Sequence, residues 1–413
     1  MAMKASGVPW IGDIPIEWII RPVKAQYSLT TGFTPSSEND SLYDDEGETW
    51  VTISDLKSDV VIDSKQKVSK VVADQHKKEL AKAGSLLYSF KLSVGTVAFA
   101  GKDLFTNEAI AAFQPISSDA DLHYLKYASS LIIGNANTNI YGATIMNQKL
   151  IYNAPLPVPP LSEQQAIADY LDNRCSKIDE IIAEATASIE EYKELKQAVI
   201  FDAVTKGLDK TVLMKDSGIP WIGKMPEHWQ LSRIKNECDN LDNLREPIRA
   251  DNRENKLGLY DYYGASGVID KIDDFNVDDT VLLIGEDGAN LKMRNLPLIY
   301  LASGRIWVNN HAHILKVKEH RNSYMFMAYM LEAGDYNDYI TGSAQPKLSQ
   351  FNLMRFPIVH PPLDEQLKIE AYLNRLIPEY DALISEKQSL IYDLQAYKKS
   401  LIYEVVTGKR RVV

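Results

Sequence analysis

The sequence lacks the features that mark secreted, membrane-bound or metal-stabilised proteins. Its only cysteines, Cys175 and Cys238, cannot form a disulfide framework and do not have the CxxC spacing of a zinc site. No run approaches the roughly 20 apolar residues that a membrane span requires, and the first residues, MAMKASGVPWIG, have no apolar signal-peptide core. We therefore expect a cytoplasmic protein that makes no membrane contact, with two reduced, packed thiols.

Usable catalytic motifs are also lacking. Asn153-Ala-Pro155 and His360-Pro-Pro-Leu363 both depart from the Asn/Asp-Pro-Pro-aromatic motif with which amino-methyltransferases hold a base amine. Residues 218–225 resemble a phosphate-binding loop, but a methionine stands where Ser or Thr must coordinate magnesium. His311 and His313 have no third metal ligand nearby in the sequence. The sequence thus predicts neither a catalytic residue nor a metal site in this chain.

A strongly basic balance is missing as well, since the formal net charge is −11. Residues 159–207 carry 5 basic and 10 acidic side chains, and residues 361–413 carry 8 of each. Residues 19–158 carry 13 basic and 15 acidic side chains, and residues 230–360 carry 15 and 18. The two long blocks are close to balance, so a local basic face can coexist with the acidic total. Net charge therefore leaves nucleic-acid binding open.

What the sequence does contain is an internal repeat. Residues 7–18 read Gly-Val-Pro-Trp-Ile-Gly followed by Pro and Trp, and residues 218–229 repeat this tryptophan motif at an offset of 211. Residues 159–164 read Pro-Pro-Leu-Ser-Glu-Gln, and residues 361–366 repeat this PPLxEQ motif at an offset of 202. The tryptophans that recur are expected to pack in the core: Trp10, Trp18, Trp221 and Trp229.

The repeat divides the chain into four segments. Residues 1–158 form a first block with its tryptophan motif, and residues 159–207 a first helical region. Residues 208–360 form a second block with its tryptophan motif, and residues 361–413 a second helical region. Two similar helical frames therefore carry two blocks that differ over most of their length.

Short apolar runs broken by Gly, Asn and Asp occur in both blocks. Thr96–Ala100, Val281–Ile284 and Ile314–Val317 are typical of strands in mixed α/β domains. The predicted fold class is α/β (α+β), with two mixed α/β domains joined by two long helices.

The helical regions contain heptad patterns. Positions with alternating spacings of three and four hold six apolar residues of seven in each copy, the exceptions being Ser188 and Lys387. This pattern predicts a coiled-coil seam between the two regions, although two helices that each pack on their own block would also be amphipathic. The predicted seam consists of Ile178, Ile181, Ala185, Tyr192, Leu195, Val199, Tyr380, Leu383, Leu390, Leu394, Tyr397 and Leu401.

The expected geometry of the helices follows from their length. Pro378 predicts a break between a short first helix and the long one in the second region. A helix over residues 178–204 would be about 40 Å long. If the helices are antiparallel, the halves are related by a pseudo-twofold axis and the two blocks lie about one turn of B-DNA apart, roughly 34 Å. A parallel pair would show the same heptads.

Together these features resemble the DNA-specificity subunits of type I restriction-modification systems, and the resemblance covers nearly the whole chain. It includes the order of the repeated segments and several short motifs within the blocks. These are Trp50–Asp55 and Thr106–Ile110 in the first block, and Tyr262–Gly267, Leu283–Gly288, Val308–His313 and Gly342–Leu348 in the second.

The resemblance implies a non-catalytic subunit that binds double-stranded DNA. Each block would be a target-recognition domain that reads one half of a split, asymmetric site, and the helices would set the spacing. Two methylation subunits would dock on the helices and methylate adenine N6 with S-adenosylmethionine, and a motor (restriction) subunit would use ATP and Mg²⁺. No cofactor is expected in this chain.

Candidate DNA contacts are side chains that can bind phosphates or base edges. In the first block they are Lys65, Lys67, Lys70, Lys91, Asn107, Tyr141, Thr144 and Lys149. In the second block they are Arg245, Arg249, Arg253, Tyr263, Ser266, Lys292, Arg294, Asn310, His311, Gln345 and Lys347.

Two other functions fit the same repeat. One is a DNA-binding regulator with two readers that needs no partner enzyme. The other is a coiled-coil adaptor whose blocks do not read DNA. Assembly with a methylation subunit and sequence-dependent methylation discriminate among the three.

Overall fold

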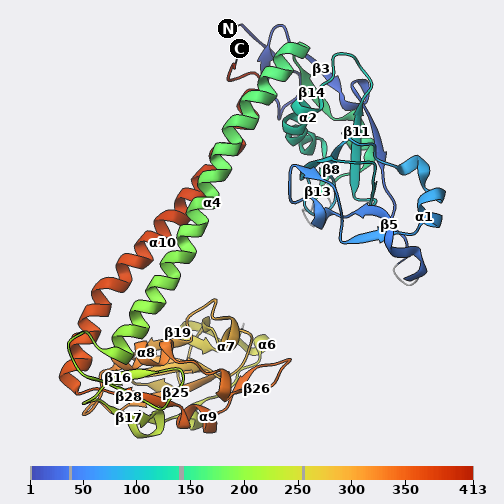
Figure 1. Ribbon diagram of the computed structural model, residues 1–413. Coiled ribbons are helices and arrows are strands. Elements are labelled where there is room, and N and C mark those ends of the chain that lie inside the picture. Colours follow the sequence, from blue (N-terminus) through green and yellow to red (C-terminus); the bar gives the residue numbers. More distant parts are fainter. Residues whose placement is uncertain (1, 37–39, 139–143, 254–255, 413) are drawn as a thin grey trace. The chain divides into compact units, whose positions relative to one another are not determined.

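The computed structural model describes residues 2–36, 40–138, 144–253 and 256–412 (Figure 1). The chain forms two compact units. Unit 1 comprises Met1–Ala185 and Leu390–Val413, and unit 2 comprises Thr186–Ser389. Each unit holds one α/β block and a part of both long helices. The division into four segments that follow chain order remains a prediction.

Unit 1 is built on a five-stranded sheet in which all neighbours are antiparallel except β9 and β6. Its order is β4 (Tyr27–Thr31), β11 (Ile110–Pro115), β8 (Leu86–Ser89), β9 (Val97–Ala100) and β6 (Val60–Val61). A second sheet has the order β10 (Phe105–Thr106), β5 (Tyr43–Val51) and β7 (Gln66–Val68). The strand pairs are β1 (Met3–Ala5) with β2 (Asp13–Pro15), β3 (Ile19–Pro22) with β14 (Pro155–Val158), and β12 (Asn137–Thr138) with β13 (Thr144–Ile145). The short helices are α1 (Lys70–Gln75), α2 (Leu122–Ala128) and α3 (Gln148–Asn153).

Unit 2 is built on a four-stranded antiparallel sheet. Its order is β18 (Cys238–Asn240), β25 (Ala312–Val317), β22 (Val281–Gly285) and β23 (Ile299–Ala302). A second sheet has the order β20 (Gly267–Ile272), β19 (Leu257–Gly264), β24 (Arg305–Val308) and β21 (Val277–Asp278). The strand pairs are β15 (Met214–Asp216) with β16 (Lys224–Pro226), β17 (Gln230–Arg233) with β28 (Pro357–His360), and β26 (Ile340–Thr341) with β27 (Lys347–Leu348). The short helices are α5 (Ile234–Glu237), α6 (Ala250–Arg253), α7 (Asn290–Met293), α8 (Tyr324–Ala333) and α9 (Gln350–Arg355).

The two blocks share one topology although their sequences differ. The strand order β4-β11-β8-β9 corresponds to β18-β25-β22-β23, and the parallel pair β5–β10 corresponds to β19–β24. A matching turn follows this pair in each unit: the backbone N–H of Asn107 donates to Val51, and that of Asn309 donates to Tyr263. Strands β9, β22 and β25 confirm the predicted strands. The repeat therefore extends into blocks whose sequences do not show it.

The long helices are α4 (Leu161–Lys206) and α10 (Leu363–Val406), and each begins at its PPLxEQ motif (Figure 1). The predicted break at Pro378 is wrong, because α10 continues through it. Proline removes one helical hydrogen bond and crowds the preceding turn. Leu373 and Ile377, in the turn that precedes the proline, are buried in the core of unit 2 and hold that turn in place. Neither long helix, nor any other helix among the described residues, has an apolar stretch that could cross a membrane.

Within each unit the two helices run antiparallel. In unit 1, Asp179 of α4 binds Lys398 of α10 at 2.6 Å, and Glu163 binds Arg411 at 3.3 Å. In unit 2, Lys196 of α4 binds Asp381 of α10 at 2.6 Å, and the core of that unit joins Ile200 to Ile369. In both units residues late in one helix lie beside residues early in the other. The parallel alternative is excluded.

The observed seam between the helices agrees with the predicted seam at alternate positions. At the positions in between, the observed seam residue is the next one along the chain. Ile178, Ala185 and Leu401 are buried, and Tyr192, Val199, Tyr380 and Leu394 are half-buried, as the heptads predict. The other predicted seam residues, Ile181, Leu195, Leu383, Leu390 and Tyr397, are exposed. Their places in the seam are taken by the next residue along the chain, which is Ile182, Lys196, Ile384, Ile391 or Lys398, and Ile189 likewise takes the place of Ser188.

Two ion pairs occupy equivalent places in this seam. The pairs are Asp179–Lys398 in unit 1 and Asp381–Lys196 in unit 2. The offset of 202 relates Asp179 to Asp381, and the same offset relates Lys196 to Lys398. In both pairs the aspartate side chain is more than half exposed. The helices therefore repeat the same antiparallel register in each unit.

The Lys196–Asp381 pair is expected to contribute little to stability. Its aspartate is solvated, and exposed ion pairs are worth about 0–1 kcal/mol. A double-mutant cycle with Lys196→Ala and Asp381→Ala, followed by urea unfolding, should give a coupling energy below about 1 kcal/mol. A larger coupling would show that charge, rather than the apolar seam, holds the register. Lys398→Ala and Asp179→Ala provide the equivalent cycle in unit 1.

The repeated motifs fix each block to the start of a long helix. In unit 1 the indole N–H of Trp18 donates to Glu163 at 2.9 Å, and in unit 2 that of Trp229 donates to Glu365 at 2.9 Å. Both tryptophans are fully buried, as predicted. The glutamine that follows, Gln164 or Gln366, binds backbone groups that lead into α2 or α8. The glutamate and the glutamine of the PPLxEQ motif thus bind the tryptophan motif and the block, respectively.

Candidate nucleic-acid interface

In unit 1 the predicted contacts form two groups. Lys91 and Lys149 line a shallow surface depression that also includes Glu108, next to Asn107 in the chain, and the other group lies at β7 and the start of α1. Thr144 lies on β13 and does not line this depression. The depression is lined by Thr31, Phe90, Lys91, Glu108, Asn147, Gln148 and Lys149. The second group consists of Lys65, Lys67 and Lys70. Tyr141 lies outside the described residues.

The charges around the depression are partly paired. Lys91 lies 3.4 Å from Glu108, with both side chains about half exposed. The side chain of Asn107 accepts the backbone N–H of Ala109, so it shapes the turn after β10. Lys149, on α3, is exposed. The depression therefore offers lysine ammonium groups and the amides of Asn147 and Gln148 at the surface, which is the mixture that phosphates and base edges require.

In unit 2 four loops meet and are joined through their backbones. The N–H of Asn309 donates to Tyr263, and the N–H of Glu286 donates to His311 at 2.8 Å. The N–H of Gly288 donates to Pro346 at 3.0 Å. These bonds bring together six of the predicted contacts, which lie on the loops or at the strand ends beside them: Tyr263, Ser266, Asn310, His311, Gln345 and Lys347.

A carboxylate lies at the centre of this loop cluster. Glu286 is nearly buried; Arg245 donates to it, and Lys347 lies 2.9 Å from its other oxygen. Burial alone would raise the pKa of Glu286, but Lys347 and Arg245 outweigh burial and hold that pKa below its ordinary value. His311 lies 2.8 Å from Asp287. Two of the predicted cations, Arg245 and Lys347, are therefore already paired, which agrees with the near-neutral charge of the block.

The loop cluster rests on a buried histidine. His313 is fully buried; its Nδ1 lies 2.6 Å from Asp242 and its Nε2 lies 2.7 Å from the carbonyl oxygen of Leu348. Asp242 and the carbonyl oxygen of Leu348 are both acceptors, so each ring nitrogen is placed to donate a hydrogen bond. Arg245 lies 3.3 Å from Asp242, which links this pair to Glu286. His313 is thus a structural support beneath the surface that carries His311.

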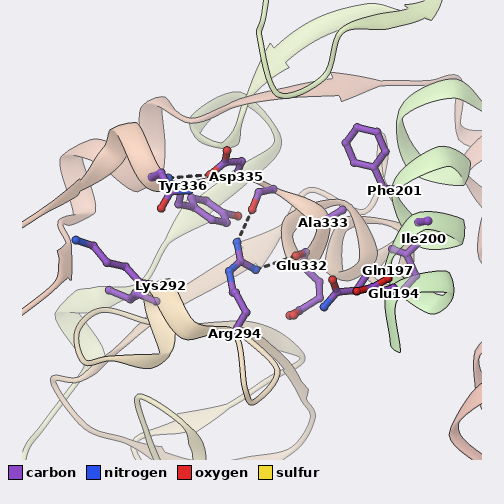
Figure 2. A pocket seen from close by; sticks show the side chains of 14 residues that line it. Glu194, Gln197, Ile200, Phe201, Lys292, Arg294, Glu332, Ala333, Asp335 and Tyr336 are labelled. Atoms are coloured by element: carbon purple, nitrogen blue, oxygen red, sulfur yellow. Dashed lines mark hydrogen bonds between the residues drawn. The ribbon is translucent and has the colours of Figure 1, made fainter. Parts of the chain in front are cut away.

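Other predicted contacts lie apart from the loop cluster. Arg294 donates to the carbonyl oxygens of Glu332 and Gly334 at the end of α8 and covers the ring of Tyr336 (Figure 2). Its guanidinium therefore closes a helix end, and a DNA contact would have to break these bonds. Lys292 and Arg294 both line a groove that has a volume of about 540 Å³. Arg253 is held by Asp270 at 3.1 Å, and Arg249 is exposed.

The acidic members of the cluster were missed by the search for donors. Glu286 and Asp287 lie within the motif Leu283–Gly288, so their position was visible, but only basic, amide and hydroxyl side chains were considered. A carboxylate can accept from the N4 amine of cytosine. Glu286 and Asp287 therefore belong with the candidate contacts.

Comparison with known proteins is consistent with this arrangement. A family model described as "Type I restriction modification DNA specificity domain" matches residues 17–191 and 226–391. A protein assigned as the MjaX specificity subunit of a type I restriction enzyme in Methanocaldococcus jannaschii is 24% identical over 434 residues, covering 97% of this chain and 96% of that one. A protein assigned as a specificity subunit in Haemophilus influenzae is 30% identical over 136 residues, covering 33% of this chain and 34% of that one. A solved structure from a study of assembly in a type I restriction-modification system has a TM-score of 0.73 at 14% identity and covers 96% of this chain and 99% of that one. This structure has the same fold.

Proposed function

Because the chain belongs to the type I restriction-modification DNA specificity family, we propose that its two blocks are target-recognition domains that each read one half of a split DNA site. The observation that carries this proposal is that one topology presents two different polar surfaces. In unit 1 the surface is the depression around Lys91 and Lys149, and in unit 2 it is the loop cluster around Glu286. Two readers with different side chains suit an asymmetric site.

The subunit itself is proposed to be non-catalytic, as is general for specificity subunits. Adenine N6 methylation would come from partner subunits that bind S-adenosylmethionine, and translocation and cleavage from a motor subunit that uses ATP and Mg²⁺. The two long helices would carry these partners and, through their length, set the spacing between the half-sites.

Exposed apolar residues on the long helices support two equivalent docking sites for methylation subunits. In unit 1, Ile181 is 44% exposed and Tyr397 is 49% exposed. In unit 2, Leu383 is 38% exposed and Leu195 is 50% exposed. The offset of 202 converts Ile181 to Leu383 and Leu195 to Tyr397. Each pair lies beside its seam ion pair, so each unit presents the same apolar patch for one helical partner.

The proposed function is tested by assembly and methylation. The chain and a cognate methylation subunit are expressed together, and methylated adenines are mapped across the host genome by sequencing. We expect methylation at one bipartite sequence, and none when either protein is expressed alone. A complex without sequence-dependent methylation would support the adaptor function. Specific DNA binding by the chain without any complex would support the regulator.

A further inference from the structure

The connection between β8 and β9 in unit 1 holds an apolar side chain outward on a polar surface. Leu92 is 93% exposed, the highest value among the large hydrophobic side chains of the described residues. Its φ is 56°, in the left-handed region that residues other than glycine, Asn and Asp rarely adopt. Both solvation and backbone geometry disfavour leucine here, so its presence suggests a role that the free protein does not reveal.

The loop is braced so that Leu92 stays outward. Phe90, two residues before it, is buried, and Val94, two residues after it, packs against the core of unit 1. The backbone N–H of Gly95 donates to Ser89 at 2.9 Å and closes the turn. The side chain at the tip therefore cannot withdraw into the core without breaking contacts on both sides.

The surroundings of Leu92 match a nucleic-acid surface. Its neighbour Lys91 lines the depression with Lys149, Asn147 and Gln148. A rigid apolar tip beside ammonium groups is the chemistry of side chains that enter between base pairs while nearby cations hold the phosphates. We propose that Leu92 is a wedge that enters between two adjacent base pairs in or beside the first half-site. This proposal rests on the proposed function.

The bracing favours a wedge over a contact with a thymine methyl group. A methyl contact can be made by small or mobile side chains. Separating two stacked base pairs instead requires a side chain that is held in its outward position. Flexible pyrimidine–purine steps are the easiest to unstack. The wedge is therefore expected at such a step.

The test uses the complex of the full chain with its methylation subunit and a duplex that carries its mapped site. 2-Aminopurine placed at successive steps of the first half-site should brighten at one step when the complex binds. Leu92→Ala should remove this signal and weaken binding about tenfold, whereas Leu92→Phe should keep the signal. Leu92→Gly should also remove the signal while raising the thermal midpoint, because glycine accepts the positive φ.

Ile116→Ala is the matched control. Ile116 is 61% exposed and follows β11 at the opposite end of the same sheet, so its loss should leave fluorescence and affinity unchanged. If Leu92→Ala keeps the signal while the wild-type complex binds its site, the wedge is overturned. If Leu92→Ala instead weakens assembly with the methylation subunit, Leu92 contacts protein and the wedge is likewise overturned. If the wild-type complex shows no specific binding, the proposed function itself fails.

Discussion

Replacing Ile181 and Leu383 with glutamate is expected to abolish methylation by preventing both methylation subunits from docking. The residues are 44% and 38% exposed, so the chain itself can accept a charge at both positions. In a complex the same side chains would be buried, and each would lose about 1.5–3 kcal/mol of apolar burial. A carboxylate buried without a partner adds a further cost. We expect affinity at each site to fall by at least about a hundredfold.

The two positions are equivalent under the repeat, so single and double variants give different stoichiometries. Ile181→Glu and Leu383→Glu alone should each leave one methylation subunit bound, and the double variant should leave none, as measured by native mass spectrometry. Leu213→Glu, at a residue that is 75% exposed and lies outside the long helices, should retain two. Full assembly of the double variant with unchanged helicity would contradict docking at this patch.

The error in the seam has a physical reason. In each copy, the predicted heptad positions and those that are buried share four members and differ at three. In α4 both sets contain six apolar residues of seven, because Ser188 interrupts one set and Lys196 the other; in α10 the predicted set contains six and the observed set five. Burial inside the chain and burial against a partner give the same periodic signal. Sequence could show that the helix has two apolar faces, but not which one the other helix covers.

The arrangement of two blocks and two long helices could be predicted because the motifs that define it occur twice in the sequence. The tryptophan and PPLxEQ motifs recur at fixed offsets, and in each unit the motif glutamate binds a tryptophan of the other motif. The continuity of α10 through Pro378 could not be predicted, since it depends on the burial of Leu373 and Ile377 in a core that also contains Ile200 and Trp229. Such tertiary contacts override a local helix breaker.

Individual contact residues were harder to predict because the same side chain serves two purposes. Arg294 looks like a phosphate contact in the sequence, yet its donors are used by the end of α8. His311 and His313 are two residues apart, yet one is exposed and the other fully buried. Loop geometry decides such cases, and single-sequence patterns do not contain it.

Asp242→Ala is expected to destabilise unit 2 by about 3–5 kcal/mol, the cost of leaving a buried charge without its partner. The substitution removes the carboxylate that faces His313 Nδ1 at 2.6 Å and Arg245 at 3.3 Å. Asp242→Asn should cost less, because its amide can donate to Nδ1 of a neutral imidazole while Nε2 still donates to Leu348. Urea unfolding should give the highest free energy of unfolding for the wild type, a lower one for Asp242→Asn and the lowest for Asp242→Ala.

The same pair predicts a pH dependence with a definite sign. Burial raises the pKa of Asp242, but the hydrogen bonds from His313 and Ile314 outweigh it and lower that pKa in the folded protein. The stability contributed by Asp242 is therefore present above the unfolded carboxyl pKa, about 3.9, and is lost as pH falls from there through the lowered folded value. The difference in unfolding free energy between wild type and Asp242→Ala should shrink across that acidic range. A difference that stays constant down to the lowest pH would contradict the charge pair.

Asp242→Ala is also expected to affect DNA reading, because Asp242 and His313 support the loop cluster. The variant should lose selectivity at the second half-site and still read the first half-site.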